Sequence, residues 1–405
     1  MDIKVTPAKL SGTVRIPSSK SVAHRMIICA SLAGNSEING IDFSKDIDAT
    51  IHAMNALGAV INKNDNSVYI PDCIKPPEKT VIDCVESGST LRFIIPVAGA
   101  SGVETEFHGR GRLPQRPIDI YTRELSRHGI HFDYHNTMPF TISGQLTGGR
   151  YEIEGNVSSQ FITGLLFALP ILDSDSEIVL TSRLESRPYV DITIDVLRKY
   201  GIMITETEYG FYIKGNQKYI PHNDTVEGDF SQGAFFYVAN AIGSDVTLEN
   251  LNPDSVQGDK KILEIISQFK KDGCFRADCS DIPDLVPILA VLASYGTGES
   301  VIYNAQRLKI KESNRLETTS ALINNIGGNA VVTEDGIIIR PTGNMTGGIV
   351  DSAGDHRITM SATIAGTMTT GEVIIKGAEA VEKSYPDFFR DYENSGGFIN
   401  VISME

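Results

Sequence analysis

The sequence has 405 residues, of which 41% are hydrophobic and 21% charged, and its formal net charge is −15. This profile is typical of a globular protein with two or three domains. The acidic balance excludes an extended nucleic-acid groove, because binding to phosphate backbones needs a dominant basic surface. No apolar run reaches the roughly 18 residues of a membrane span and no leader pattern opens the chain, so we expect a cytoplasmic protein without a membrane partner.

The five cysteines stand at positions 29, 73, 84, 274 and 279. Their number is odd, and none belongs to the paired Cys and His spacing of a zinc site. We therefore predict unpaired thiols and no metal site.

In chain order, the predicted elements begin with a strand in "DIKVTPAKLSG", and one pattern then recurs. A helical or polar segment ends in Gly, and a short strand, a turn and a second strand follow, as in "KYGIMITETEYGFYI". Each glycine suits the left-handed backbone after a helix C-terminus. Five copies keep a period of about 70 residues and "KKDGCFRADCS" is shortened. The junction glycines are Gly58, Gly129, Gly201, Gly273, Gly327 and Gly396.

An apolar helix that begins with small or polar residues recurs in step with this pattern, at residues 18–34, 87–102, 158–170, 230–243, 281–298 and 355–371. These helices are apolar nearly all round, which predicts burial inside a domain. Helix N-termini attract anions, and cations lie in or near several first turns: Lys20, Arg25, Arg92, His356 and Arg357. We infer a pseudo-symmetric α/β protein of two domains with a polyanion site between the halves. For any single copy, simple N-capping by Ser or Asp remains the alternative.

The repeats also predict the domain boundaries. Three units fill residues 15–226, which form the N-terminal domain. The remaining three, together with the first strand, form a discontinuous C-terminal domain of residues 1–14 plus 227–405. We expect short, hinge-like connections because no Gly/Ser linker is present.

One stretch concentrates opposed charge: "KIKESNR", residues 309–315. The spacing of Asn314 and Glu317 fits a capping box, so an ordinary solvated helix start is one interpretation. A catalytic turn is the other.

Eight segments, in this order, resemble motifs of the 5-enolpyruvylshikimate-3-phosphate (EPSP) synthase family: "PSSKSVAHR", "SGSTLRF", "VSSQFITGLL", "ESRPYVDIT", "IPDLVP", "RLKIKESNRL", "DHRITM" and "KSYPDFF". The resemblance runs from residue 1 to about 392. It implies a two-domain inverse α/β barrel, each domain made of three βαβαββ units, with the active site in the interdomain cleft.

The resemblance also implies the activity. Members transfer the enolpyruvyl group of phosphoenolpyruvate to the 5-hydroxyl of shikimate 3-phosphate and release phosphate, on the route to chorismate and the aromatic amino acids. The reaction passes through a tetrahedral ketal and uses neither a metal nor an organic cofactor. The two substrates are the expected small-molecule partners, we expect a monomer, and the family is the target of glyphosate.

Site residues transfer one by one from the matched motifs. Those expected to take part in catalysis are Lys20, Asp284, Lys311, Glu312 and Lys383. The phosphoenolpyruvate side is expected to comprise Lys20, Gly88, Ser89, Arg116, Gln160, Arg315, Arg357 and Lys383. The shikimate 3-phosphate side is expected to comprise Ser21, Arg25, Ser158, Ser159, Gln160, Ser186, Tyr189, Asp284, Asn304 and Lys311. We assign Glu312 to proton exchange at carbon 3 and Asp284 to the hydroxyl, and the division of these roles with Lys20 stays open. His356 is either a proton relay or a structural histidine.

The sequence departs from the family pattern at three positions: Glu86 replaces the usual Asn, Asn314 replaces Asp, and Arg110 lies where acidic residues are common. Two other functions have to be compared with this one. The sister transferase that acts on a UDP-sugar carries a Cys or Asp on the third-motif loop, and "GRGRLPQRP" has neither. A non-catalytic anion-binding protein would have lost Lys20, Asp284 or Glu312, and all three are present.

Overall fold

A computed structural model describes residues 1–403 and divides the chain into two compact units. Ser18–Glu227 form one, here called the N-terminal unit; Met1–Pro17 and the chain from Gly228 onward form the other, the C-terminal unit. The first boundary lies beyond the expected residue 14, because Ile16 is fully buried in the core of the C-terminal unit and donates its backbone N–H to Glu249. The second lies after Glu227, since the Gly228 N–H bonds to Asn250 in the same unit.

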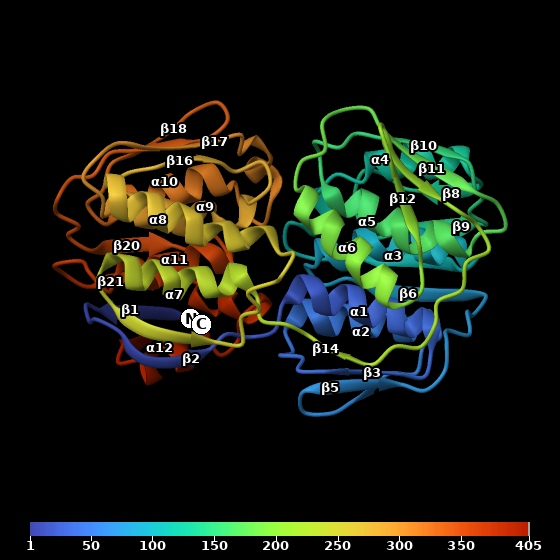
Figure 1. Ribbon diagram of the computed structural model, residues 1–405, viewed down its shortest axis with the longest axis horizontal. Helices are drawn as coiled ribbons and strands as arrows, with labels where there is room; N and C mark the ends of the chain where they lie inside the picture. The colour runs from blue at the N-terminus through green and yellow to red at the C-terminus, as the bar shows by residue number, and fades with distance from the viewer. Residues whose placement is uncertain (404–405) are drawn as a thin grey trace. The chain divides into compact units, whose positions relative to one another are not determined.

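The N-terminal unit contains three four-stranded sheets and six α-helices (Figure 1). The sheets have the orders β14-β3-β5-β4, β6-β7-β9-β8 and β10-β11-β13-β12. The strands are β3 (Ser36–Asn39), β4 (Asn62–Lys63), β5 (Ser67–Ile70), β6 (Lys79–Asp83), β7 (Glu104–His108), β8 (Ile130–Asp133), β9 (Phe140–Gly144), β10 (Arg150–Ile153), β11 (Ser176–Leu180), β12 (Ile204–Thr207), β13 (Gly210–Ile213) and β14 (Asp224–Thr225). The helices are α1 (Lys20–Ala33), α2 (Lys45–Ala56), α3 (Gly88–Ala100), α4 (Asp119–Arg127), α5 (Ser159–Ala168) and α6 (Arg187–Lys199), with short 3-10 helices η1 (Leu113–Gln115) and η2 (Leu169–Ile171).

Each sheet of this unit joins a parallel pair to an antiparallel hairpin. In the second repeat, β6 and β7 are parallel and α3 connects them, while β9 and β8 complete the sheet in antiparallel order. The third repeat follows the same plan with β10, α5 and β11. In the first repeat, β14 from the end of the unit supplies the missing parallel partner of β3. Each repeat is therefore a βαβαββ unit.

The C-terminal unit has two four-stranded sheets, β20-β21-β1-β22 and β16-β17-β19-β18, and the pair β15-β2. Its strands are β1 (Asp2–Thr6), β2 (Ser11–Arg15), β15 (Asp245–Glu249), β16 (Arg276–Asp278), β17 (Ser300–Tyr303), β18 (Ala330–Val332), β19 (Ile337–Ile339), β20 (Gly348–Asp351), β21 (Val373–Lys376) and β22 (Phe398–Ser403). Its helices are α7 (Phe230–Ile242), α8 (Ile262–Asp272), α9 (Val286–Ser294), α10 (Arg315–Asn325), α11 (His356–Ala365) and α12 (Phe388–Asn394), with 3-10 helices η3 (Gly258–Lys261), η4 (Pro283–Leu285), η5 (Gln306–Ile310) and η6 (Ala378–Lys383).

The first strand completes this unit, since β1 lies between β21 and β22 and is antiparallel to both. One repeat differs from the predicted pattern. After Gly273 the segment forms only β16, which pairs in parallel with β17 of the next repeat, so the expected second strand is absent from "KKDGCFRADCS". The shortened spacing leaves no residues for a hairpin there. The sheet of this repeat therefore consists of only two strands, β15 and β2.

The six apolar helices predicted from sequence are the buried elements of the two cores. In α3, every residue from Leu91 to Gly99 is buried, and α9 is buried from Val286 to Ser294. Each unit has its own hydrophobic cluster. A helix that is buried on all sides still has free N–H groups at its N-terminal end. Polar side chains are therefore expected to gather at that end.

Candidate active site

In the C-terminal unit, acidic residues stand at the N-terminal ends of the three buried helices. Asp229 caps α7 by accepting from the Ser231 N–H at 2.8 Å, and Asp355 caps α11 by accepting from the Arg357 N–H at 3.0 Å. Asp284 lies in η4, directly before α9. Carboxylates at helix N-termini satisfy free N–H groups and favour the helix dipole.

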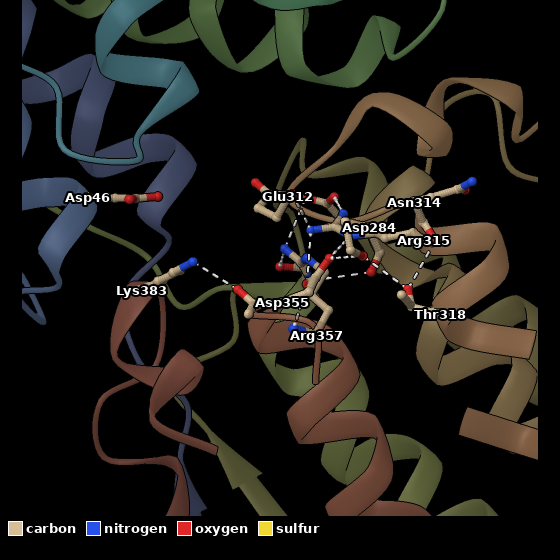
Figure 2. A network of polar contacts seen from close by, with 12 residues as sticks. Asp46, Asp284, Glu312, Asn314, Arg315, Thr318, Asp355, Arg357 and Lys383 are labelled. Atoms are coloured by element: carbon tan, nitrogen blue, oxygen red, sulfur yellow. Dashed lines mark hydrogen bonds and ion pairs between the residues drawn. The ribbon is translucent and has the colours of Figure 1, made fainter. Parts of the chain in front are cut away.

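Arg315, the first residue of α10, connects Asp284 and Asp355 with Glu312 (Figure 2). Its side chain is 1% exposed. The guanidinium donates to Asp284 at 2.8 Å, to Glu312 at 2.6 Å and, through Nε, to Asp355 at 2.8 Å. A guanidinium is the only side chain with enough fixed donors for three such partners. The "KIKESNR" turn is thus folded around a buried ion network.

Arg357 forms the second cationic arm of this network. Its Nη2 donates to Asp284 Oδ2 at 2.9 Å and to Ser231 Oγ at 3.1 Å. Asp284 therefore bridges two arginines, one on each carboxylate oxygen. Ser313 donates to Asp355 at 3.0 Å, so that the turn, α9 and α11 share one hydrogen-bonded cluster.

The surrounding charges determine the protonation states of Asp284 and Arg315. Burial alone would raise the pKa of Asp284, but the positive charges of Arg357, Lys311 and Arg315 outweigh burial and hold the pKa well below its usual range. Burial alone would lower the pKa of the Arg315 guanidinium, but the surrounding carboxylates raise it. Asp284 is consequently ionised at neutral pH in this arrangement, which makes it an anchor for cations and a weak proton acceptor.

The capping-box interpretation of this turn is wrong. Asn314 occupies the N-cap position of α10, yet its side chain makes no capping hydrogen bond. Lys309 is structural in its contacts, since it donates to the Glu334 carbonyl at 2.8 Å. Lys311 ends η5 in an extended conformation, directly before Glu312.

Three further predicted residues lie in the C-terminal unit. Lys383, at the end of η6, donates to the Gly354 carbonyl at 2.8 Å, beside the cap of α11. Asn304 follows β17 with a left-handed φ of 54° and donates its amide to Asp278 at 2.9 Å. His356 is buried at 2% exposure in the first turn of α11.

In the N-terminal unit, serines replace the acidic caps. Ser87 caps α3 through the Thr90 N–H at 3.2 Å and Ser158 caps α5 through the Gln160 N–H at 3.3 Å. Ser19 precedes α1 without a side-chain capping bond. Neutral caps leave the positive ends of these helices without a fixed counter-charge, which suits the binding of an external anion.

Cations gather at these helix ends. Lys20 is paired with Asp46 at 2.9 Å. Arg25 is 3% exposed, and it donates to Thr193 Oγ1 at 2.8 Å, to the Ser21 carbonyl at 2.6 Å and to the Tyr189 carbonyl at 2.9 Å. Ser186, which precedes α6 with a left-handed φ of 55°, lies three residues before Tyr189. Arg25 thus links Ser21 and Tyr189, two of the predicted shikimate 3-phosphate residues, across α1 and α6.

A second cluster joins α3 and α5. Gln160 donates to Ser89 Oγ at 2.9 Å and accepts from Arg92 at 2.8 Å, while Ser159 is buried beside it at 6% exposure. Gly88 opens α3 beneath the Arg116 guanidinium, so closely that an added Cβ would lie 2.5 Å from Nη1. A side chain at this position would have to displace the guanidinium, and Arg116 is itself 8% exposed.

Within each unit, the structure therefore groups the predicted residues around the N-terminal ends of the buried helices. The sequence reasoning missed Asp355, Asp46 and Ser231, which hold Arg315, Lys20 and Arg357. Asp355 lies two residues before Arg357 in "DHR". The opposite charges of these two residues were the one feature of the sequence that could have indicated a role for Asp355. Within residues 1–403, no group of three His, Cys, Asp or Glu side chains is arranged to hold a metal ion, and no helix is long and apolar enough to span a membrane.

The fold and this site define an α/β protein built from repeats, in which arginines, lysines and carboxylates converge on helix N-termini, as needed by an enzyme that acts on anionic substrates. Residues 5–392 match the sequence profile of the EPSP synthase (3-phosphoshikimate 1-carboxyvinyltransferase) family. The chain belongs to this family.

Relatives agree over the full length. A 3-phosphoshikimate 1-carboxyvinyltransferase of Clostridium novyi is 44% identical over 100% of this chain and 99% of its own, and one of Clostridioides difficile is 42% identical over 99% of each. The solved EPSP synthase of Acinetobacter baumannii superposes with a TM-score of 0.82 at 24% identity, over 99% of this chain and 100% of its own. The predicted two-domain inside-out α/β barrel is confirmed.

Proposed function

We propose that this chain transfers the enolpyruvyl group of phosphoenolpyruvate to the 5-hydroxyl of shikimate 3-phosphate and releases phosphate. Membership of the EPSP synthase family supports this reaction. The carrying observation is the network in which buried Arg315 contacts three carboxylates, those of Asp284, Glu312 and Asp355. Arg357 adds a second arginine through Asp284, so acidic and cationic groups meet at one site among helix N-termini.

The reaction moves protons at carbon 3 of phosphoenolpyruvate and at the acceptor hydroxyl. Carbon 3 gains a proton while the hydroxyl gives up its own proton and its oxygen bonds to carbon 2, which gives a tetrahedral ketal. Carbon 3 then loses a proton as the bond from carbon 2 to the phosphate oxygen breaks. The atoms balance without an oxidant or reductant, so positioned acid/base groups and cations suffice.

We assign the carbon 3 proton to Glu312. Its carboxylate is 24% exposed and accepts a hydrogen bond from Arg315, whereas Asp284 is held by two arginines and has a pKa well below its usual range. A group that must gain and lose a proton during one turnover needs the less strongly stabilised charge. Asp284 then orients the acceptor hydroxyl as a hydrogen-bond acceptor, with Lys311 as its neighbouring cation.

The arginines and lysines take the anionic groups. Arg116 above Gly88, together with Lys20, would bind phosphoenolpyruvate in the N-terminal unit, since forked and point cations suit phosphate and carboxylate groups. Gln160 and Ser89 would orient the same substrate. In the C-terminal unit, Arg315, Arg357 and Lys383 would bind it, and each would exchange a present protein contact for one to the substrate.

The acceptor would use the serines and Arg25. Ser158, Ser159, Ser186, Ser21 and Tyr189 lie on or beside the ends of α1, α5 and α6, the elements that Arg25 connects. Asn304 would hold a ring hydroxyl. We also propose that the enzyme acts as a monomer in the cytoplasm, because a single chain carries the residues matched to both substrates.

Acceptor choice tests the proposed function. Phosphate release from phosphoenolpyruvate is measured with shikimate 3-phosphate or with UDP-N-acetylglucosamine as acceptor. We expect release only with shikimate 3-phosphate. Faster release with the UDP-sugar would assign the chain to the sister transferase, and release with neither would contradict a transferase.

A further inference from the structure

Two loops of the N-terminal unit, residues 84–87 and 109–112, lie side by side at the ends of the parallel strands β6 and β7. Asp83 and His108 are register partners at the last position of these strands. Beyond them, the Cys84 N–H donates to the His108 carbonyl at 2.9 Å and the Arg110 N–H donates to the Val85 carbonyl at 2.7 Å. The first loop leads into α3, and the second leads to Arg116.

Val85 makes the turn between β6 and α3 unusual. Its φ is 55°, in the left-handed region that a β-branched residue rarely adopts. Strain of this kind persists where the surrounding structure determines it, and it clusters at functional sites. Here the turn directs the next residue, Glu86, toward the second loop: a Cβ added at Gly111 would lie 2.6 Å from Glu86 Oε2.

The charges of the two loops are complementary. The second loop carries Arg110 and Arg112 and leads to Arg116, and the first loop carries Glu86 and follows Asp83, the last residue of β6. Arg110 contacts Asp83 at 3.4 Å, but both groups are more than half exposed, so this pair is weak. Glu86 is the more enclosed of the two acids.

We propose that Glu86 is a positioning residue for phosphoenolpyruvate: its carboxylate, seated over Gly111, holds the arginine loop so that Arg116 stays above Gly88. This inference rests on the proposed function. Two close approaches carry this inference. Glu86 approaches Gly111, and Arg116 approaches Gly88, and Gly111 and Arg116 are the two ends of one short segment, residues 111–116.

Two effects of Glu86 oppose each other. A negative charge near the site repels an anionic substrate, whereas a fixed loop preorganises the cation that binds it. The carboxylate lies against Gly111 and the Arg116 guanidinium lies against Gly88, so the carboxylate acts on the guanidinium through the residues between Gly111 and Arg116. We therefore infer that positioning outweighs repulsion.

The test is Glu86→Gln, which keeps the size of the side chain and removes its charge. We expect KM for phosphoenolpyruvate to rise about fivefold, with kcat and KM for shikimate 3-phosphate unchanged, since this is the upper range for the contribution of a partly exposed charge. A fall in KM for phosphoenolpyruvate would show that repulsion dominates, and an unchanged KM would show that Glu86 has no role. Either result overturns the proposal.

Matched variants separate positioning from other causes. Asp83→Asn removes the charge of the residue that precedes this loop, keeps an oxygen that can accept from the Val85 N–H, and should leave all constants unchanged. Gly111→Ala places a methyl group where the carboxylate lies, so it should raise KM for phosphoenolpyruvate as Glu86→Gln does. In the double variant, Gly111→Ala should raise KM little beyond the effect of Glu86→Gln alone. Gly343→Ala has the same left-handed strain, with φ 72° and no neighbour within 4 Å, and controls for backbone strain. Failure of the unchanged protein to use either acceptor would contradict the proposed function, whereas normal turnover without a KM effect would contradict only the role of Glu86.

Discussion

Single residues in the C-terminal unit combine structural and chemical roles. Asp355 is fully buried; it caps α11 and at the same time accepts two hydrogen bonds from Arg315, at 2.8 and 3.4 Å. Arg315 in turn contacts Glu312 and Asp284. A buried ion network of this kind depends on every partner, because a partner left alone becomes an uncompensated buried charge.

Asp355→Asn tests this dependence. The amide can still cap α11, but it loses the charge that balances Arg315, so the free energy of unfolding should fall by about 3 kcal/mol. Urea titration measures it. Glu299→Gln, at an exposed pair with Arg340, is the matched control and should change stability by less than about 1 kcal/mol. Equal effects of the two variants would contradict a buried-network role.

Glu312→Gln tests the proton assignment. The amide keeps a hydrogen bond to Arg315 but cannot exchange a proton, so kcat should fall at least about a hundredfold. Calorimetry should show both substrates still bound. Glu317→Gln, in the first turn of α10, is the control and should retain full turnover. Near-normal kcat in Glu312→Gln would remove Glu312 from the mechanism.

At the scale of elements, the buried helices are joined by polar contacts within the N-terminal core. His24 of α1 contacts Thr50 of α2 at 2.7 Å, and Thr50 contacts Thr90 of α3 at the same distance. Thr90 donates to Ser87, the cap of α3. This series of hydrogen bonds holds the N-terminal parts of α1 and α3, where Lys20, Gly88 and Ser89 lie.

His24 makes this core sensitive to acid. Burial, and then the charges of Lys20 and Arg25, lower its pKa well below the ordinary value. The unfolded chain takes up this proton below about pH 6.5 while the folded chain does not, so stability is lost as pH falls from there toward the folded pKa. We expect the free energy of unfolding to fall with a slope of up to about 1.4 kcal/mol per pH unit from this group. His24→Asn should flatten the slope between about pH 6.5 and 5.5, and the exposed control His135→Asn should not. The same slope in both variants would contradict this origin.

The buried helices α3 and α5 pack closely against each other. A Cβ added at Gly164 of α5 would lie within 3.0 Å of both the Arg92 carbonyl and the Tyr121 hydroxyl. Gly164→Ala should therefore destabilise the protein by about 2 kcal/mol in urea titration, through forced separation of the helices. Gly233→Ala in α7 meets only a flexible leucine at 3.1 Å and should be neutral or slightly stabilising. A neutral Gly164→Ala would contradict tight packing.

At the scale of the whole molecule, the repeat explains how much the sequence could predict. The junction glycines and six apolar helices predicted an α/β protein of repeated units, and the fold agrees, including the place of the first strand in the C-terminal unit. The hairpin after Gly273 could not be excluded, because one shortened repeat carries no local signal for strand pairing across repeats. The exact ends of the units also depend on tertiary contacts, as at Ile16.

The site was predictable in part for the same reason. The motifs indicated Arg315, Glu312 and Asp284, and the structure brings these three side chains into contact, while their roles stay predictions. The contact of Asp355 with Arg315 could not be predicted, because a capping aspartate has the same sequence pattern whether or not it also binds an arginine. The capping box at Asn314 failed for the opposite reason: the spacing is present, but Arg315 organises the turn. The left-handed φ of Val85 leaves no sequence signal, since β-branched residues rarely adopt it.

The reaction in heavy water tests the central claim most directly. The protein is incubated with phosphoenolpyruvate and shikimate 3-phosphate in D2O, and proton and phosphorus NMR follow the products. Enolpyruvyl transfer through a ketal predicts equal amounts of inorganic phosphate and an enol ether at the 5-oxygen, with deuterium in the methylene group, because carbon 3 gains and loses a proton in every turnover. Phosphate without an enol ether, or an enol ether without deuterium, would contradict the account.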